Sequence, residues 1–178
     1  MDWLLTRRSE ENALPEVRWA GPFQDTLDVF IPLMTRWLEN APGLVRLALG
    51  VVAHEPVQDR IAGYRKLAQY LPAVQVDPER SEDFLYQINR PRKSTVIETL
   101  KINRLSRWSS VVVVALRFAL SPLPVVHQSA DGNHTFRIEL DLSTDAELGG
   151  ELPRAQLPRL LKELESLANE LVTRGDIP

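Results

Sequence analysis

The feature that most limits the fold is an apolar helical stripe near the end of the chain. Between residues 156 and 174, apolar side chains recur every three or four residues, the spacing of one helix face. The stripe consists of Leu157, Leu160, Leu161, Leu164, Leu167, Ala168, Leu171 and Val172. Gly175 then ends the helix. Burying the six leucines and the valine is worth about 10 kcal/mol before entropy is subtracted, so the chain must offer this helix a broad apolar surface.

Strand-like segments fill most of the remaining chain. We predict strands at 16–20, 44–53, 84–89, 96–105, 110–120, 125–129 and 135–142, with Gly50 as a bulge or a point of close backbone approach. The last strand alternates cleanly, with Phe136, Ile138, Leu140 and Leu142 facing inward. Residues 111–116 are apolar at every position, which favours the centre of a sheet. Asp131-Gly132-Asn133 predicts a hairpin between the last two strands.

Two further helices are predicted at 23–38 and 57–71, the first kinked or split by Pro32. This order of elements predicts an α+β fold. We expect a single antiparallel, curved sheet of about five to seven strands, helices on one face, and the long C-terminal amphipathic helix. Residues 1–15 are expected to form a flexible arm, tacked to the body by Trp3, Leu4 and Leu5, and 16–178 a single domain.

Composition narrows the class of protein. The 178 residues include no cysteine, which excludes disulfides, thiolate metal sites and cysteine nucleophiles. The first residues lack the order of a signal peptide, because acids follow the basic pair Arg7-Arg8. The longest apolar region, 111–126, contains Arg117 and two prolines and is too short to span a bilayer. We therefore expect a soluble, cytoplasmic protein with no membrane association.

No residue pattern predicts catalysis. His54, His127 and His134 share no metal-ligand spacing, and the serines lack the turn that presents a hydrolase nucleophile. Asp141 and Asp145 could offer oxygen ligands to a cation, but the pattern of a calcium loop is missing. The eight glycines form neither a phosphate loop nor a dinucleotide fingerprint. We expect no cofactor, no metal and no catalytic residue.

A basic segment is the one feature above background. Residues 84–107 contain six basic side chains and a single acid, Glu98, whereas the whole chain has a net charge of −3. Aromatic residues are interleaved with these charges, a combination found in nucleic-acid sites. The candidate binding residues are Arg90, Arg92, Lys93, Asn103, Arg104, Arg107 and Trp108. The alternative is a solvated sheet face whose cations pair with Glu79, Glu82, Asp83 or Glu98.

The tripeptide Ile-Asn-Arg occurs twice in this segment, at 88–90 and 102–104. Asparagine is disfavoured inside strands, so two copies indicate specific side-chain hydrogen bonds. If the copies lie on neighbouring strands, their asparagines and arginines converge on one patch.

Three functional hypotheses follow. The first is a non-enzymatic binding or interaction protein that docks a protein partner or encloses a small ligand, because arginine and tryptophan are enriched in interfaces. The second is nucleic-acid or phosphate and other anionic-ligand binding through the Arg90–Arg107 cluster; the acidic net charge makes nucleic acid the less favoured ligand. The third, and weakest, is an enzyme working through His54 or His127.

Overall fold

The computed structural model describes residues 3–5, 19–114, 116–119, 125–128, 132–145 and 149–177. The elements are α1 (Phe23–Glu39), β1 (Ala48–Pro56), α2 (Arg60–Tyr70), β2 (Leu85–Asn89), β3 (Arg92–Lys93), β4 (Lys101–Val113), β5 (Leu116–Ala119), β6 (Val125–Gln128), β7 (Asn133–Thr144), the 3₁₀ turn η2 (Arg154–Gln156) and α3 (Leu157–Arg174).

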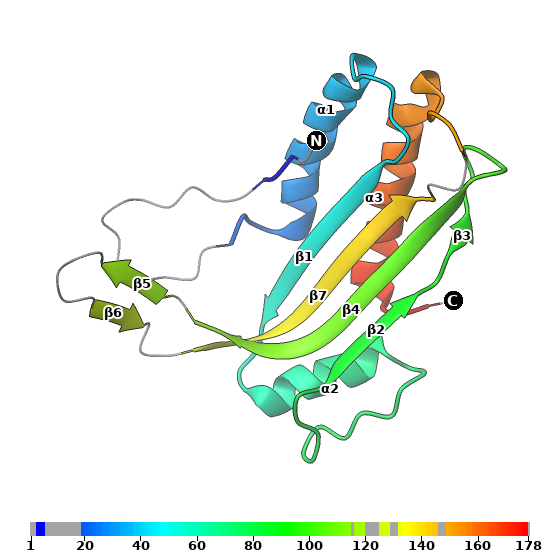
Figure 1. Ribbon diagram of the computed structural model, residues 1–178. Coiled ribbons are helices and arrows are strands. Elements are labelled where there is room, and N and C mark those ends of the chain that lie inside the picture. The colour runs from blue at the N-terminus through cyan, green and yellow to red at the C-terminus, as the bar shows by residue number, and fades with distance from the viewer. Residues whose placement is uncertain are drawn as a thin grey trace.

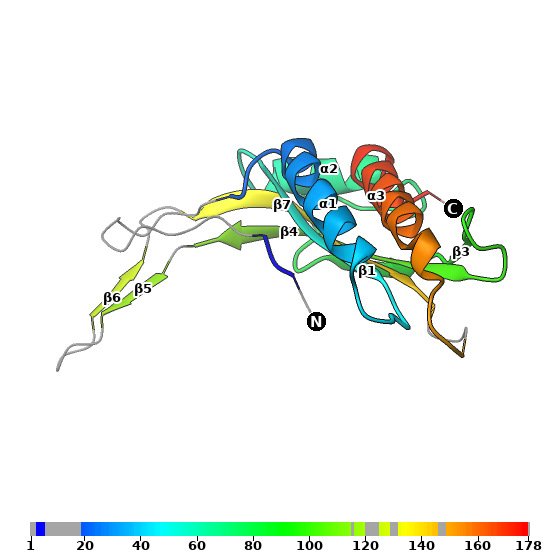
Figure 2. The same ribbon diagram turned by 90° about the horizontal axis from the view of Figure 1, so that it is seen from above.

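Five strands form one open antiparallel sheet. Its order is β1-β7-β4-β2, and the short β3 also pairs with β4. Strands β5 and β6 pair with each other in a separate two-stranded ribbon. Helices α1, α2 and α3 lie against one face of the main sheet, and no helix from the described part of the chain lies on the opposite face (Figures 1 and 2). The predicted α+β fold with an antiparallel sheet and helices on one face is confirmed.

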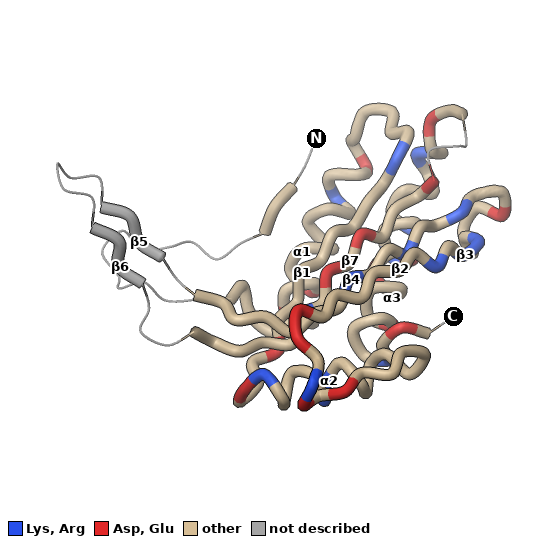
Figure 3. The backbone as a smooth tube through the Cα atoms, turned by 60° about the horizontal axis from the view of Figure 1, so that its bottom comes forward, with Lys and Arg blue, Asp and Glu red and all other residues tan. Residues whose placement is uncertain are grey.

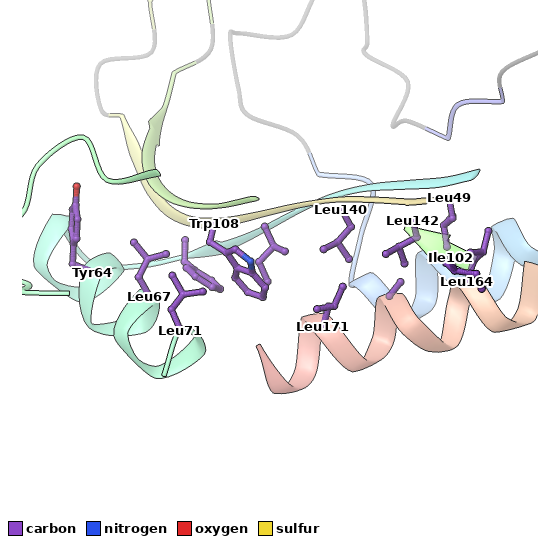
Figure 4. Close-up of a cluster of buried hydrophobic side chains, with 13 residues drawn as sticks. Leu49, Tyr64, Leu67, Leu71, Ile102, Trp108, Leu140, Leu142, Leu164 and Leu171 are labelled. Carbon is purple, nitrogen blue, oxygen red and sulfur yellow. The ribbon is translucent and has the colours of Figure 1, made fainter. Parts of the chain in front are cut away.

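The helical stripe of α3 packs against the inward side chains of β7, as both patterns predict. Phe136, Ile138, Leu140 and Leu142 are all buried, and so are Leu164 and Leu171. Figure 4 shows side chains of α2 and α3 meeting those of the sheet in one layer, with Trp108 at the α2 end and Ile102 near Leu164. A second cluster joins α1 to the N-terminal half of α3. The final helix is therefore shared by both parts of the core.

Several predicted boundaries are wrong. The predicted strand 96–105 begins only at Lys101, because the Ser94 hydroxyl accepts hydrogen bonds from the backbone of Val96 and Ile97 and turns the chain there. The prediction that residues 111–116 lie at the sheet centre fails, since β4 ends at Val113 and Val112 is 52% exposed. These valines lie at the end of β4 from which the β5–β6 ribbon departs, beyond the cover of the helices (Figure 1).

The predicted hairpin between 125–129 and 135–142 is also wrong. Strand β6 pairs with β5, whereas β7 pairs with β1 and β4. Helix α1 continues through Pro32, so the predicted split is absent; Pro32 is exposed, and water can satisfy the carbonyl that loses its partner. Trp19 and Ala20 are not in a strand, and the rest of the predicted strand 16–20 lies outside the described residues.

Gly175 ends α3 in a conformation that other residues avoid. Its φ is +81°, and an added Cβ would come within 2.3 Å of the Tyr70 carbonyl oxygen. That oxygen already accepts the Asp176 N–H at 2.9 Å. The Gly175→Ala variant should lose about 2 kcal/mol of unfolding free energy, measured by urea denaturation. Gly150→Ala is the matched control, because no described residue lies within 4 Å of its Cβ position; equal stability of the two variants would contradict the prediction.

The remaining expectations concern the chain end and the membrane. Trp3 contacts Trp37 of α1 edge to face, with ring centroids 5.9 Å apart, in agreement with an N-terminal segment tacked to the body. Residues 1–2 and 6–15 of the expected arm lie outside the described residues. No helix in the described ranges is long and apolar enough to cross a membrane.

Candidate functional site

The basic segment is divided between the two faces of the sheet. Because side chains alternate along a strand, Arg104 of β4 points toward the helices and Arg107 points to the open face. Across the sheet, Arg107 lies opposite Glu139 of β7 and Gln87 of β2. Figure 3 shows basic and acidic positions interspersed over the strands and helices. The segment therefore does not form one continuous basic surface.

The arginines on the helix side are ion-paired with acids from the end of the chain. Arg90 donates two hydrogen bonds to Asp176, at 2.7 and 2.9 Å. Arg92 binds Glu170 at 2.8 Å, and Arg104, only 1% exposed, lies 3.5 Å from the same carboxylate. Ion pairing of these cations was the alternative prediction, but the partners are Glu170 and Asp176 rather than the acids closer in sequence. The ion pairs attach the end of α3 to β2, β3 and β4, and they leave less positive charge for an anionic ligand.

The pKa values report this network. The Arg90 guanidinium, hydrogen-bonded to Asp176, holds the pKa of that carboxyl below its usual range. Burial raises the pKa of Tyr86, whose hydroxyl donates to Asp176 at 2.9 Å. Burial, with the neighbouring charge of Arg92, lowers the pKa of Arg104. Two of the guanidinium nitrogens of Arg104, Nε and Nη1, have no hydrogen-bond partner among the described residues.

The two copies of the tripeptide lie on neighbouring segments and contact each other, but their side chains do not form the single patch that was predicted: Asn89 and Asn103 are on the open face, whereas Arg104 is on the helix side. The Asn89 amide donates to the Asn103 side-chain oxygen at 3.1 Å and accepts the Arg104 N–H at 2.9 Å. The Arg90 N–H also donates to the Arg104 carbonyl. The repeat therefore fastens the chain to β4 at the short break between β2 and β3, on either side of which the pairing with β4 has the same register.

Two other candidate residues lie apart from this network. Lys93 is exposed on the short β3. Trp108 is fully buried, and its indole N–H donates to the Ser106 hydroxyl at 2.9 Å. Trp108 therefore packs the core and offers no surface for stacking.

A groove of about 770 Å³ lies at the other edge of the sheet, beside β1; we call it the β1 groove. One wall comes from the N-terminal segments and α1. Its residues are Trp3, Leu4, Leu5, Trp19, Ala20, Gly21, Phe23, Thr26, Leu27 and Phe30. The other wall is the sheet, through residues 49–54 with Leu105, Arg107, Glu139, Leu140 and Asp141. Residues 3–5 pass outside the β1 edge in both views (Figures 1 and 2).

The groove runs along the free edge of β1. Six consecutive residues of this strand, 49–54, line it. The side chains of successive residues point to opposite faces. The groove contacts all six residues and is also lined by α1 on the helix side and by Leu105 and Asp141 on the open face, so it reaches around the backbone edge of β1.

The ladder shows which backbone groups face the groove. The Leu47 carbonyl accepts the Thr144 N–H, and the Val57 N–H donates to the His134 carbonyl. In an antiparallel pair the direction of these groups alternates, so the odd-numbered residues of β1 bond to β7. Gly50, Val52 and His54 therefore present their N–H and C=O groups to the groove. Within the described part of the chain, no strand pairs with this edge.

The groove is mainly apolar, with a few polar groups on its sheet side. His54 stacks against Trp19, with ring centroids 4.6 Å apart, and its Nδ1 lies 3.1 Å from the Thr135 hydroxyl. Burial and the charge of Arg137 lower the pKa of His54. Arg107 is the one basic candidate residue that lines the groove, and its Nε donates to Gln87 at 2.6 Å.

The shift in His54 predicts a pH effect on stability. Because its folded pKa lies below 6.5, the unfolded chain binds the proton more readily, and unfolding becomes easier as pH falls through 6.5. His54→Gln should remove this part of the acid sensitivity. Urea denaturation between pH 7.5 and 5.5 measures it; parallel pH profiles for the two proteins would refute the assignment.

The remaining chemical candidates lie apart. His134 is in β7 and His127 in β6 of the separate ribbon. Asp141 is on the open face, near Arg46, and Asp145 follows the end of β7. Among the described residues, no three His, Asp or Glu side chains lie close enough to hold a metal ion.

No protein-family model, curated protein or solved structure matches the chain. Interpretation of the site therefore depends on its geometry. Sequence reasoning missed the β1 groove, because strand periodicity does not reveal which strand is at an edge. Its one relevant signal was Gly50, expected as a bulge or a close approach; the register is unbroken there, so no bulge exists.

Proposed function

We propose that this protein is an interaction domain that binds an extended segment of a partner protein along the free edge of β1. The observation that carries the proposal is the contact of six consecutive β1 residues with one groove. A segment in that groove pairs its backbone with Gly50, Val52 and His54 and adds a strand to the sheet.

The proposal also explains why this edge can remain open. A long, flat, apolar edge strand is an aggregation hazard, and proteins usually shield such edges with charges, bulges or covering elements. Between Ala48 and Ala53, β1 has no charged side chain and no bulge. Instead the edge lies between two walls, one from α1 and the N-terminal segments and one from the open face of the sheet, where a second sheet would have to approach. Apolar side chains of that segment meet Phe23, Leu27 and Phe30 on one side.

A peptide-display experiment tests this function. A library of linear random nonapeptides is selected against the full chain, and the binders are studied by amide hydrogen exchange. Binding should slow exchange at Gly50, Val52 and His54, whose amides face the groove, and change little at Leu49, Val51 and Ala53, which already bond to β7. Failure to select any binder, or protection confined to other elements, would rule out the proposal.

Two proline substitutions distinguish the backbone groups that face the groove from those that bond to β7. Val52→Pro removes an N–H that faces the groove and adds a ring that blocks pairing, but it keeps the bonds to β7. We expect a folded protein whose affinity for the selected peptides falls at least tenfold, since several strand hydrogen bonds are lost. Val51→Pro, one residue away, removes a hydrogen bond of the ladder with β7 and should be clearly less stable than Val52→Pro. Tight peptide binding by Val52→Pro, measured by titration calorimetry, would contradict edge pairing.

A further inference from the structure

The open-face side of the β1 groove has a feature that points to the chemistry of the partner. The strand register places Gly50 beside Asp141 of β7, and Asp141 beside Leu105 of β4. A strand paired with β1 would continue this row, so the residue opposite Gly50 would look across the glycine toward Asp141.

Gly50 leaves that path open. A Cβ built on Gly50 meets only the Leu140 carbonyl oxygen, at 4.0 Å, so the space above its backbone is unoccupied by described residues. Neighbouring strands are about 4.8 Å apart, which places Asp141 two strand spacings from the partner segment. This distance is within the combined reach of a long basic side chain and an aspartate. The aliphatic stem of the basic residue would lie over Gly50, with Leu105 beyond it.

The charges of the groove favour a cation at this position. Asp141 and Glu139 line the groove against a single arginine, Arg107. Glu139 already binds Arg137 at 3.0 Å. Asp141 is 52% exposed, and among the described residues its one ion-pair contact is a long one, 3.8 Å, to the similarly exposed Arg46, which donates to Ser143 at 2.9 Å. Asp141 is therefore the carboxylate that a ligand can engage.

We infer that the partner segment carries a lysine or arginine at the position paired with Gly50, and that Asp141 binds its charge. This inference depends on the proposed strand addition and names the class of segment that the groove selects. The segment is extended, apolar on the side that faces α1, and basic at one fixed position on the side that faces the open sheet.

The test repeats the nonapeptide selection with three forms of the full chain: wild type, Asp141→Asn and Asp141→Lys. Wild type should enrich lysine or arginine at one fixed position between alternating apolar residues. Asp141→Asn should lose that preference, and the affinity of the best basic peptide should fall about fivefold, as expected for an exposed ion pair. Asp141→Lys should enrich glutamate or aspartate at the same position. Glu82→Gln, an equal change of charge at an exposed site remote in sequence, serves as the control.

Gly50→Leu fills the open space over residue 50 and leaves the charge of Asp141 unchanged. Because its Cβ has space, the variant should fold with wild-type stability, and it should still bind strand-forming peptides while losing the basic preference. Peptides that protect Gly50, Val52 and His54 but show no basic preference would overturn this inference and leave strand addition intact. A library that yields no binders overturns both. An unchanged preference in Asp141→Asn would also overturn the inference.

Discussion

Replacement of Leu164 by aspartate is expected to unfold most of the protein. Leu164 is fully buried in the cluster that joins α3 to the sheet (Figure 4). The substitution removes a leucine from a close-packed site, which costs about 2–5 kcal/mol, and buries a carboxylate for which the cluster offers no cation. The total approaches the entire stability of a typical domain, about 5–15 kcal/mol.

Circular dichroism during heating measures the effect, and the Leu164→Asp variant should show little cooperative melting at any temperature. Ser166→Asp introduces the same side chain two residues later, at an exposed position of the same helix. That control should melt within a few degrees of wild type. A melting temperature for Leu164→Asp close to that of Ser166→Asp would show that α3 is not central to the core.

Loss of the Glu170 charge is expected to have the second-largest effect. Glu170 is the carboxylate shared by Arg92 and the fully buried Arg104. Glu170→Gln keeps the shape of the side chain but leaves the Arg104 charge without this partner in the protein interior. Breaking a buried ion pair in this way costs roughly 3–5 kcal/mol. Urea denaturation should show a loss of at least the lower value.

A second substitution tests the cause. Arg104→Met in the Glu170→Gln background removes the stranded charge, and it should recover much of the lost stability. Recovery is plausible because Arg104 Nε and Nη1 have no partners to lose among the described residues. Glu165→Gln, which breaks a pair with the exposed Lys162, should cost less than about 1 kcal/mol. If Glu170→Gln were no worse than this control, the ion pairs would contribute little.

The periodicity of apolar residues made two elements of the core, α3 and β7, predictable from the sequence. The inward face of α3 is a stripe of leucines, and the inward positions of β7 from Phe136 to Leu142 are all apolar, so both follow from the pattern. Strand β4 does not follow it. Arg104 and Ser106 occupy buried positions there: Arg104 has a long contact with the distant Glu170, and the Ser106 hydroxyl accepts the Trp108 indole N–H. Residues 84–120 therefore resembled two solvent-exposed strands followed by a separate buried strand.

The candidate site was less predictable than the fold. The residues expected to bind a ligand were chosen for charge, but the acids that neutralise Arg90 and Arg104 lie more than 60 positions further along the chain. Strand order, which makes β1 an edge, depends on long-range pairing with β7. The juxtaposition of residues 3–5 with that edge is equally non-local. Only Arg107 belongs both to the predicted set and to the β1 groove.

The side chains of β1 alternate between positions that pack in the core and positions that are free of it. Leu49, Val51 and Ala53 face the helices or pack against the core, whereas Gly50 and Val52 lie on the open side. Substitutions at Gly50 and Val52 therefore change the groove while leaving the core contacts of Leu49, Val51 and Ala53 in place. One strand thus separates a surface that tolerates change from the packing that holds the fold.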